Sequence, residues 1–208
     1  MFLEFVFVVL IGYLLGAFPF GLLIARMTRG INVREYGSGN VGFANVLRTA
    51  GAGAGIATFI LDIGKGTVAA WLGGEIVGGD GHTAAVVVAG LAAVAGHNWS
   101  IYLKFQGGKG VNTSVGGLIA MSPWIGLACL AIGGTIILVS RYVSVGSMSG
   151  ALSSILILAP LAITGREPAE YLIYCVIVTS LIIFRHRDNI SNLCAGTERR
   201  IGQKGEKR

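Results

Sequence analysis

The sequence predicts an all-helical integral membrane protein, a single domain over residues 1–208 with seven transmembrane helices. Of its 208 residues, 53% are hydrophobic and only 12% are charged, and the mean hydropathy is +0.73. Soluble domains carry about 25% charged residues, so this chain lacks the polar groups needed to cover a water-facing surface. Because about 20 apolar residues cross a hydrocarbon core of about 30 Å, the length accommodates six or seven spans and little else.

Apolar stretches alternate with short polar connections along the chain. They occupy residues 2–25, 53–74, 83–103, 113–139, 145–164 and 169–184. The first stretch carries Glu4 in place of a basic n-region and continues into a segment with glycine and proline. We therefore expect a retained helix and not a signal peptide.

Basic residues set the direction of the spans. Arginines follow the first stretch in the 26–52 connection, whereas Glu75 and Asp80 follow the second. The positive-inside rule then places the N-terminus outside and the 26–52 loop in the cytoplasm. The tail from about 185 to 208 holds seven of the sixteen basic residues and is expected in the cytoplasm as well.

This orientation requires two helices within residues 113–139. Between a cytoplasmic Lys109 and a cytoplasmic tail the chain must cross an even number of times, yet only three apolar stretches remain. Proline lacks an amide hydrogen and disfavours a helical residue before it, so Ser122-Pro123 is the expected break. Both resulting helices are predicted to be shorter than a normal span.

Small and charged residues within the spans have structural interpretations. The pairs Gly12/Gly16, Gly51/Gly55 and Gly146/Gly150 are typical of close helix packing in lipid. Asp62 and Lys65 are spaced to pair with each other. Cys129, Cys175 and Cys194 have no short spacing, and no acidic cluster is present, so neither a disulfide framework, a metal site nor a cofactor is predicted.

The first polar loop reads GSGNVGFANVLR from Gly37 to Arg48. GSGNVG has the spacing of a dinucleotide-binding motif, but it follows a membrane helix and lacks the βαβ unit that such a site requires. Closely spaced glycines can still turn successive backbone amides toward an anion. We expect a phosphate site here, and a tight interhelical turn is the alternative.

The second loop reads GHNWSIYLKFQGGKGVNTSVG from Gly96 to Gly116. It does not have the Walker spacing, but it places Lys109 on a flexible, glycine-flanked backbone at a helix N-terminus, which favours a second phosphate contact. The alternative for Lys109 is a topological anchor. His97 is either a ligand or a helix-end histidine.

The third loop and the tail add further polar groups at the same membrane face. RYVSVGS contributes Ser144, and RHRDNI places His186 and Asn189 on one helical face. The basic charge of the chain is assigned to topology and anionic lipid, with no nucleic-acid partner. Two anion sites without a strong nucleophile favour an enzyme that uses an already activated, phosphorylated acyl donor. A transporter of a phosphorylated metabolite and a non-catalytic scaffold are the alternatives.

At this point the motifs resemble a known family. GYLLGAFPFGLLIAR, GSGNVGFAN, DIGKG, the second loop, RYVSVGS and RHRDNISNLCAGTE occur in the order and spacing of the bacterial acyl-phosphate:glycerol-3-phosphate acyltransferases, the PlsY family. The resemblance implies seven helices in the bacterial cytoplasmic (inner) membrane with the active site facing the cytoplasm. It also implies acyl transfer from acyl phosphate to the 1-hydroxyl of glycerol 3-phosphate, giving lysophosphatidic acid and orthophosphate without a cofactor, at the first acylation step of phospholipid synthesis.

The resemblance also implies roles for particular residues. Ser38, Lys109 and His186 take catalytic positions. The substrate-binding positions are Gly39, Asn40, Gly42, Asn45, Arg48, His97, Gly107, Gly108, Ser144 and Asn189. Phe43-Ala44 replaces the common Ala-Thr, and Asn192 replaces a common Arg, which affects details of phosphate contact. Either His186 or the donor's own phosphate takes the hydroxyl proton, and the acyl-chain preference and oligomeric state are left open.

Overall fold

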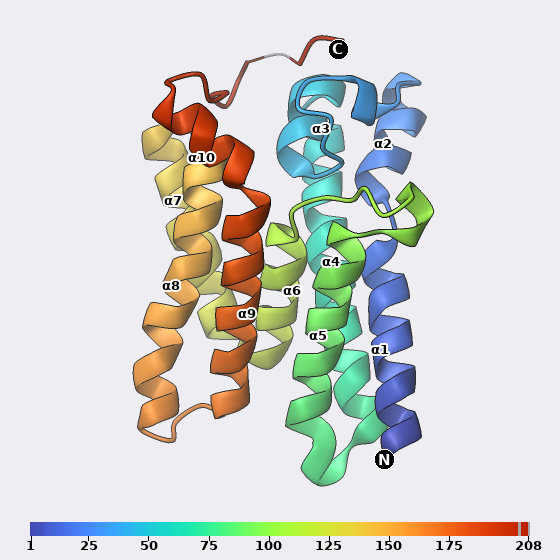
Figure 1. Cartoon of the computed structure of the whole chain (residues 1–208), viewed down its shortest axis with the longest axis vertical. Helices are drawn as coiled ribbons and strands as arrows, with labels where there is room; N and C mark the ends of the chain where they lie inside the picture. The colour runs from blue at the N-terminus through green and yellow to red at the C-terminus, as the bar shows by residue number, and fades with distance from the viewer. Residues whose placement is uncertain (204, 208) are drawn as a thin grey trace.

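The computed structural model describes residues 1–203 and 205–207, and the longer helices run side by side along its long axis (Figure 1). The described residues contain one isolated bridge, between Tyr36 and Lys207, and no longer strand. The helices are α1 (Phe2–Ala17), α2 (Phe20–Arg29), α3 (Phe43–Ala50), α4 (Ala52–Val77), α5 (His82–Asn98), α6 (Val111–Met121), α7 (Pro123–Ser140), α8 (Val143–Ile163), α9 (Ala169–Arg185) and α10 (Arg187–Cys194). Three 3₁₀ turns complete them: η1 (Val33–Glu35), η2 (Gly79–Gly81) and η3 (Ile101–Leu103).

Five segments are long and apolar enough to cross a membrane. They are Phe2–Arg29, Ala52–Val77, Gly79–Leu103, Pro123–Ser140 and Val143–Ile163. A sixth candidate consists of α9 and α10 together, bent by 55° between them. These lengths and compositions agree with an integral membrane protein.

The predicted break at Ser122-Pro123 is confirmed. Helix α6 ends at Met121, and Pro123 is the first residue of α7, where its missing amide hydrogen has no helical partner to lose. The prediction that both helices are short is wrong for α7, whose 18 residues reach Ser140. Helix α6 has 11 residues and is about 16 Å long at 1.5 Å per residue, well below the thickness of a hydrocarbon core.

Two groups of helices pack on either side of α6, with α1, α4 and α5 on one side and α7, α8 and α9 on the other (Figure 1). A buried apolar core joins them where α5, α6 and α9 meet. Tyr174 is fully buried there, and its hydroxyl donates a hydrogen bond to the Ser114 carbonyl at 2.9 Å. Many large apolar side chains on the outside of the bundle are exposed, Trp71 and Leu156 among them, as expected of a lipid-facing surface.

Two of the three predicted glycine pairs are confirmed as helix contacts. A Cβ on Gly16 of α1 would lie 2.0 Å from the Ala93 carbonyl oxygen of α5, so only glycine allows this approach. Gly146 and Gly150 of α8 pack in the same way on Gly133 of α7. Gly51 differs because it ends α3 with φ +100°, and so it serves the turn into α4.

The polar loops gather at one end of the molecule. Helices α2, α3 and α10 and the C-terminus lie at this end, and the N-terminus lies at the other (Figure 1). Between α1 and α2 the chain breaks at Phe18 and Pro19, which lets α2 cover the packed apolar cluster beneath α3. The expectation that the three motif loops and the tail share one face is confirmed.

Candidate active site

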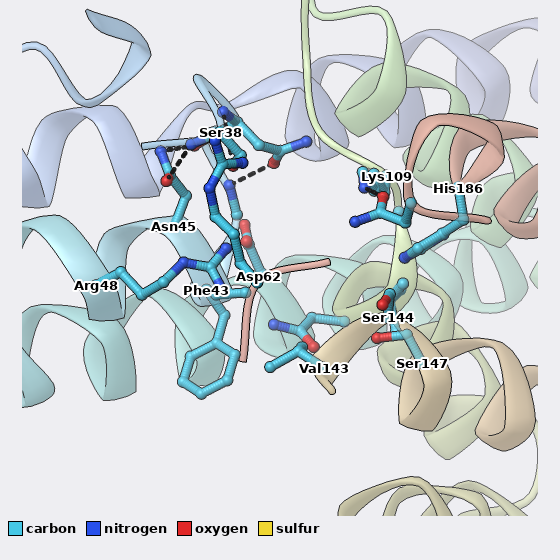
Figure 2. A pocket seen from close by; sticks show the side chains of 18 of the residues that line it. Ser38, Phe43, Asn45, Arg48, Asp62, Lys109, Val143, Ser144, Ser147 and His186 are labelled. Carbon is cyan, nitrogen blue, oxygen red and sulfur yellow. Dashed lines mark hydrogen bonds between the residues drawn. The ribbon is translucent and has the colours of Figure 1, made fainter. Parts of the chain in front are cut away.

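A polar cavity of about 110 Å³ lies at the loop end of the bundle. Figure 2 shows Ser38, Asn45 and Arg48 on one side of it and Lys109, Ser144 and His186 on the other. Most of the predicted site residues line it: Ser38, Asn40, Gly42, Asn45, Arg48, His97, Lys109, Ser144, His186 and Asn189. The remaining predicted positions, Gly39, Gly107 and Gly108, lie in the supporting loops.

The glycine-rich loop is held open by backbone conformation and by one buried amide. Gly37 and Gly39 have φ of +57° and +73°, a region in which a side chain is strained. The Asn45 side chain is only 1% exposed, and its oxygen accepts a hydrogen bond from the Ser38 amide at 2.9 Å. Its nitrogen donates to the carbonyl oxygens of Val33, Tyr36 and Asn40 at 2.9–3.1 Å. Asn45 therefore supports the loop, and its polar atoms are occupied by the loop backbone.

Arg48 extends from α3 into the same cavity. Among the described residues its buried Nε has no hydrogen-bond acceptor. Burial and the nearby Arg199 charge lower the pKa of Arg48, although a guanidinium stays protonated at neutral pH. A buried cation with a spare donor fits an anionic ligand.

Lys109 lies on the opposite side of the cavity from Arg48, in the loop that leads into α6. Gly110 is the N-cap with φ +77°, and the Lys109 ammonium group donates a hydrogen bond to the side-chain oxygen of Asn189. Burial lowers the pKa of Lys109 to about 8, against the opposing attraction of Glu198 and Asp188. Lys109 is therefore cationic at neutral pH and loses its proton as the pH rises above its pKa of about 8.

The prediction that the neighbouring glycines give Lys109 a flexible backbone is wrong. A Cβ on Gly108 would lie 2.1 Å from the His97 ring nitrogen, and one on Gly107 would lie 2.0 Å from the His97 carbonyl oxygen. Arg185 donates to the Gly108 carbonyl at 2.8 Å. Glycine is needed here for close packing, which fixes the position of Lys109.

His186 lies between α9 and α10 and is only 3% exposed. Its Nδ1 is 2.8 Å from the Ile182 carbonyl oxygen, so in the neutral ring Nδ1 carries the proton and Nε2 is the acceptor. Burial, and the positive charge of Lys109, lower the pKa of His186 to about 4. The imidazole is therefore neutral at pH 7 and able to accept a proton or a hydrogen bond.

A carboxylate organises the polar groups next to His186. Glu198 accepts hydrogen bonds from the Ser144 hydroxyl and the Asn189 amide, each at 2.7 Å. Because Asn189 also contacts Lys109, the loop before α6 is joined to α8 and α10 at this point.

A buried ion pair lies at the base of the cavity. Lys65 contacts Asp62 at 2.7 Å, as the i,i+3 spacing predicts, and both side chains are nearly inaccessible. Lys65 also donates to the Phe18 carbonyl at 3.1 Å, which accepts the Phe20 amide as well. The His97 Nδ1 atom is 3.7 Å from the same Asp62 oxygen, so His97 is a buried supporting residue that also lines the cavity.

An apolar cavity of about 380 Å³ adjoins the polar one. It is walled by α6, α7, α8 and α9, with residues such as Leu118, Leu130 and Val178. The two cavities share Phe43, Val111, Asn112, Val143 and Ser147. A phosphate-sized polar pocket that opens into an apolar channel fits an amphiphile with an anionic head and a hydrocarbon chain.

The family model described as glycerol-3-phosphate acyltransferase matches residues 6–196 of this chain. The chain belongs to the glycerol-3-phosphate acyltransferase family. Among its relatives, glycerol-3-phosphate acyltransferase of Thermoanaerobacter sp. (strain X514) is 43% identical over 197 residues, covering 95% of this chain and 96% of the relative. Glycerol-3-phosphate acyltransferase 3 of Dehalococcoides mccartyi (strain ATCC BAA-2266 / KCTC 15142 / 195) is 40% identical over 210 residues, covering 95% of each chain.

Solved structures give the same result. The crystal structure of PlsY, an integral membrane glycerol 3-phosphate acyltransferase, in its glycerol 3-phosphate form superposes with a TM-score of 0.86 at 36% identity, covering 95% of this chain and 96% of that one. The lysophosphatidic acid form superposes with a TM-score of 0.83 at 36% identity, covering 95% of each chain. The family resemblance drawn from the motifs is confirmed.

Sequence reasoning missed several residues of this acyltransferase site. Asp62, Glu198 and Arg199 line the polar cavity, and Arg185 fixes the Lys109 loop. The sequence predicts only an ion pair for Asp62, and only a basic tail for Arg185 and Arg199. Glu198 follows α10 in an irregular segment, where no helical or strand period indicates its neighbours.

Proposed function

We propose that this acyltransferase moves a fatty acyl group from acyl phosphate to the 1-hydroxyl of sn-glycerol 3-phosphate, giving 1-acyl-glycerol 3-phosphate and orthophosphate. The observation that carries the proposal is the polar cavity with Arg48 and Lys109 opening into an apolar one. The glycerol 3-phosphate and lysophosphatidic acid forms of the related PlsY structure support the acceptor and the product.

The reaction is a direct transfer. The 1-hydroxyl oxygen attacks the acyl carbon, the bond from that carbon to the phosphate oxygen breaks, and the phosphate leaves with the bonding electron pair. Backbone amides of the glycine-rich loop around Ser38 and Gly39 stabilise the charge that grows on this leaving group, a contribution that is large in acyl transfer. The Lys109 ammonium and the Arg48 guanidinium bind phosphate charge that is present throughout.

The hydroxyl proton has two possible acceptors, His186 and the donor phosphate. The Nδ1–H group of the neutral His186 ring donates a hydrogen bond to the Ile182 carbonyl, which leaves Nε2 as the proton-accepting atom. This tautomer supports His186 as the base, and Ser144 and Asn189 beside it then orient the glycerol group. The donor phosphate takes the proton if His186 only orients the substrate.

The acyl chain occupies the apolar cavity between α6 and α9. Below it the next turns carry buried apolar residues, namely Leu158, Met121, Ile125 and Tyr171, none of which lines the cavity. The channel therefore ends inside the bundle. This closed floor disfavours the alternative of a transporter, which needs a path to the opposite end.

We further propose seven membrane crossings, with α6 as the short one, and a site that faces the cytoplasm of a bacterial inner membrane. Basic residues concentrate at the site end, whereas Glu4, Glu75 and Asp80 lie in the elements at the other end. The positive-inside rule then puts the N-terminus outside.

The test is an assay of the purified protein with acyl phosphate and glycerol 3-phosphate, scored for lysophosphatidate and orthophosphate. Acyl-CoA and acyl carrier protein thioesters serve as competing donors, and equal turnover with a thioester would contradict the proposed donor. Uptake of glycerol 3-phosphate into sealed vesicles without any acylated product would favour the transporter.

A further inference from the structure

The C-terminal segment that follows α10 leads from the α8 side of the loop end toward α3 (Figure 1), and its residues Glu198 and Arg199 line the polar cavity. It leaves α10, contacts the residues just before α8, and then contacts the glycine-rich loop on the opposite side of the cavity. On the α8 side the Ile201 amide donates to the Arg141 carbonyl at 2.8 Å, and Arg200 contacts the Tyr142 hydroxyl at 3.2 Å. The segment extends past residue 196, where the match to the family model ends.

Backbone atoms make the contacts between the C-terminal segment and the glycine-rich loop and α3. The Gly37 amide donates to the Glu206 carbonyl at 2.8 Å, and the Gly205 amide donates to the Arg48 carbonyl at 3.2 Å. An antiparallel bridge joins Tyr36 to Lys207. The segment therefore contacts Gly37, where the glycine-rich loop begins, and Arg48, whose side chain lines the cavity.

Gly205 packs closely against Thr49 and Gly37. A Cβ there would be 2.6 Å from the Thr49 methyl carbon and 3.2 Å from the Gly37 Cα atom. The contact is therefore steric as well as hydrogen-bonded, and a single methyl group is enough to disturb it.

We infer that residues 202, 203 and 205–207 act as a strap that positions the glycine-rich loop and Arg48 for the phosphate groups of the two substrates. This inference rests on the proposed function. Backbone hydrogen bonds of the C-terminal segment join α3 and the glycine-rich loop, on one side of the cavity, to the residues just before α8 on the other. Losing the strap lets Gly37 and Arg48 shift relative to Lys109, which weakens phosphate binding.

The steric contact gives a test by rescue. Gly205→Ala should raise the KM for glycerol 3-phosphate about tenfold, the equivalent of one or two backbone hydrogen bonds. The KM for acyl phosphate should rise as well, since the glycine-rich loop that the strap positions also holds the donor phosphate. Thr49→Ser removes the opposing methyl group but keeps the hydroxyl that bonds to the Asn45 carbonyl, so it should be silent alone and should restore the KM of Gly205→Ala.

Two controls distinguish the loss of the strap from the loss of a positive charge and from a loss of stability. Lys207→Ala removes a basic side chain but no backbone hydrogen bond, and it should have a wild-type KM. A chain that ends at Ile201 should repeat the Gly205→Ala effect while its melting temperature stays close to wild type. A Gly205→Ala enzyme with wild-type KM, or an equal loss in every kinetic parameter without rescue by Thr49→Ser, would overturn the inference.

A crosslink tests the contact without any assay of activity. In a Cys194→Ser background, cysteines at Thr49 and Gly205 should form a disulfide on mild oxidation, because their Cβ atoms fall within bonding reach. Failure to crosslink would refute the strap. Wild-type protein that makes no lysophosphatidate would instead refute the proposed function and leave the crosslink result standing.

Discussion

The perturbed lysine beside the cavity predicts how the reaction depends on pH. Burial lowers the pKa of Lys109 to about 8, so the cation that binds phosphate is present below that pH and is lost above it. The kcat/KM for glycerol 3-phosphate reports groups of the free enzyme and should therefore fall as the pH rises through 8.

The size of the effect follows from the charged fraction of Lys109. With a pKa of about 8, about 90% of the lysine is charged at pH 7 and about 10% at pH 9. The expected loss in kcat/KM between these values is about tenfold. The substrate phosphate has its second pKa near 6, so it stays doubly ionised over this range and does not contribute to the change.

The assay is initial-rate kinetics from pH 6.5 to 9.5, for wild type and Lys109→Arg, with acyl phosphate held well below its KM so that the free enzyme predominates. A guanidinium stays protonated throughout, so the variant should have a lower rate but a flat profile above pH 8. A wild-type profile that is flat to pH 9.5 would refute the assignment. A variant that keeps the wild-type decline would assign it to another group.

The remaining predictions concern the loop, the base and the topology. Gly39→Ala should abolish turnover in a folded, membrane-inserted protein, because φ at this position is +73° and a Cβ obstructs the anion-binding amides; near-normal activity would restrict the glycine to packing. His186→Ala should lower kcat by about two to four powers of ten if His186 is the base, with both substrates saturating; a nearly unchanged kcat in His186→Gln would make the donor phosphate the proton acceptor. In intact cells a membrane-impermeant maleimide should label a cysteine at Asp80 and not the exposed native Cys194, and the reverse pattern would invert the topology.

Local sequence features predict much of the fold and of the site. The proline at 123 breaks the long apolar stretch through its own backbone chemistry, and the i,i+3 spacing of Asp62 and Lys65 forms their ion pair. The same applies to the clustering of the motif loops. Basic residues place each loop on one membrane face, so no distant contact has to be known.

Features that depend on distant contacts are not predictable in this way. Glu198 bonds to Ser144, which lies 54 residues earlier in the chain, and the Gly108 loop is fixed by Arg185, 77 residues away. The glycines around Lys109 predict flexibility, because nothing in the local sequence indicates that the His97 ring packs against them. The chain carries no local signal for any of these pairings.

The electrostatics of the cavity depend on which charges are already paired. Its lining contains two carboxylates, Asp62 and Glu198, which would repel a phosphate in a water-poor site if they were unopposed. Lys65 neutralises Asp62 at 2.7 Å, and the Glu198 oxygen accepts hydrogen bonds from Ser144 and Asn189, so neither carboxylate is unopposed. Arg48, Lys109 and Arg199 are the cations in the lining of the cavity. An incoming phosphate then supplies the acceptor that the buried Arg48 Nε lacks among the described residues, which explains how an anion binds beside two acids.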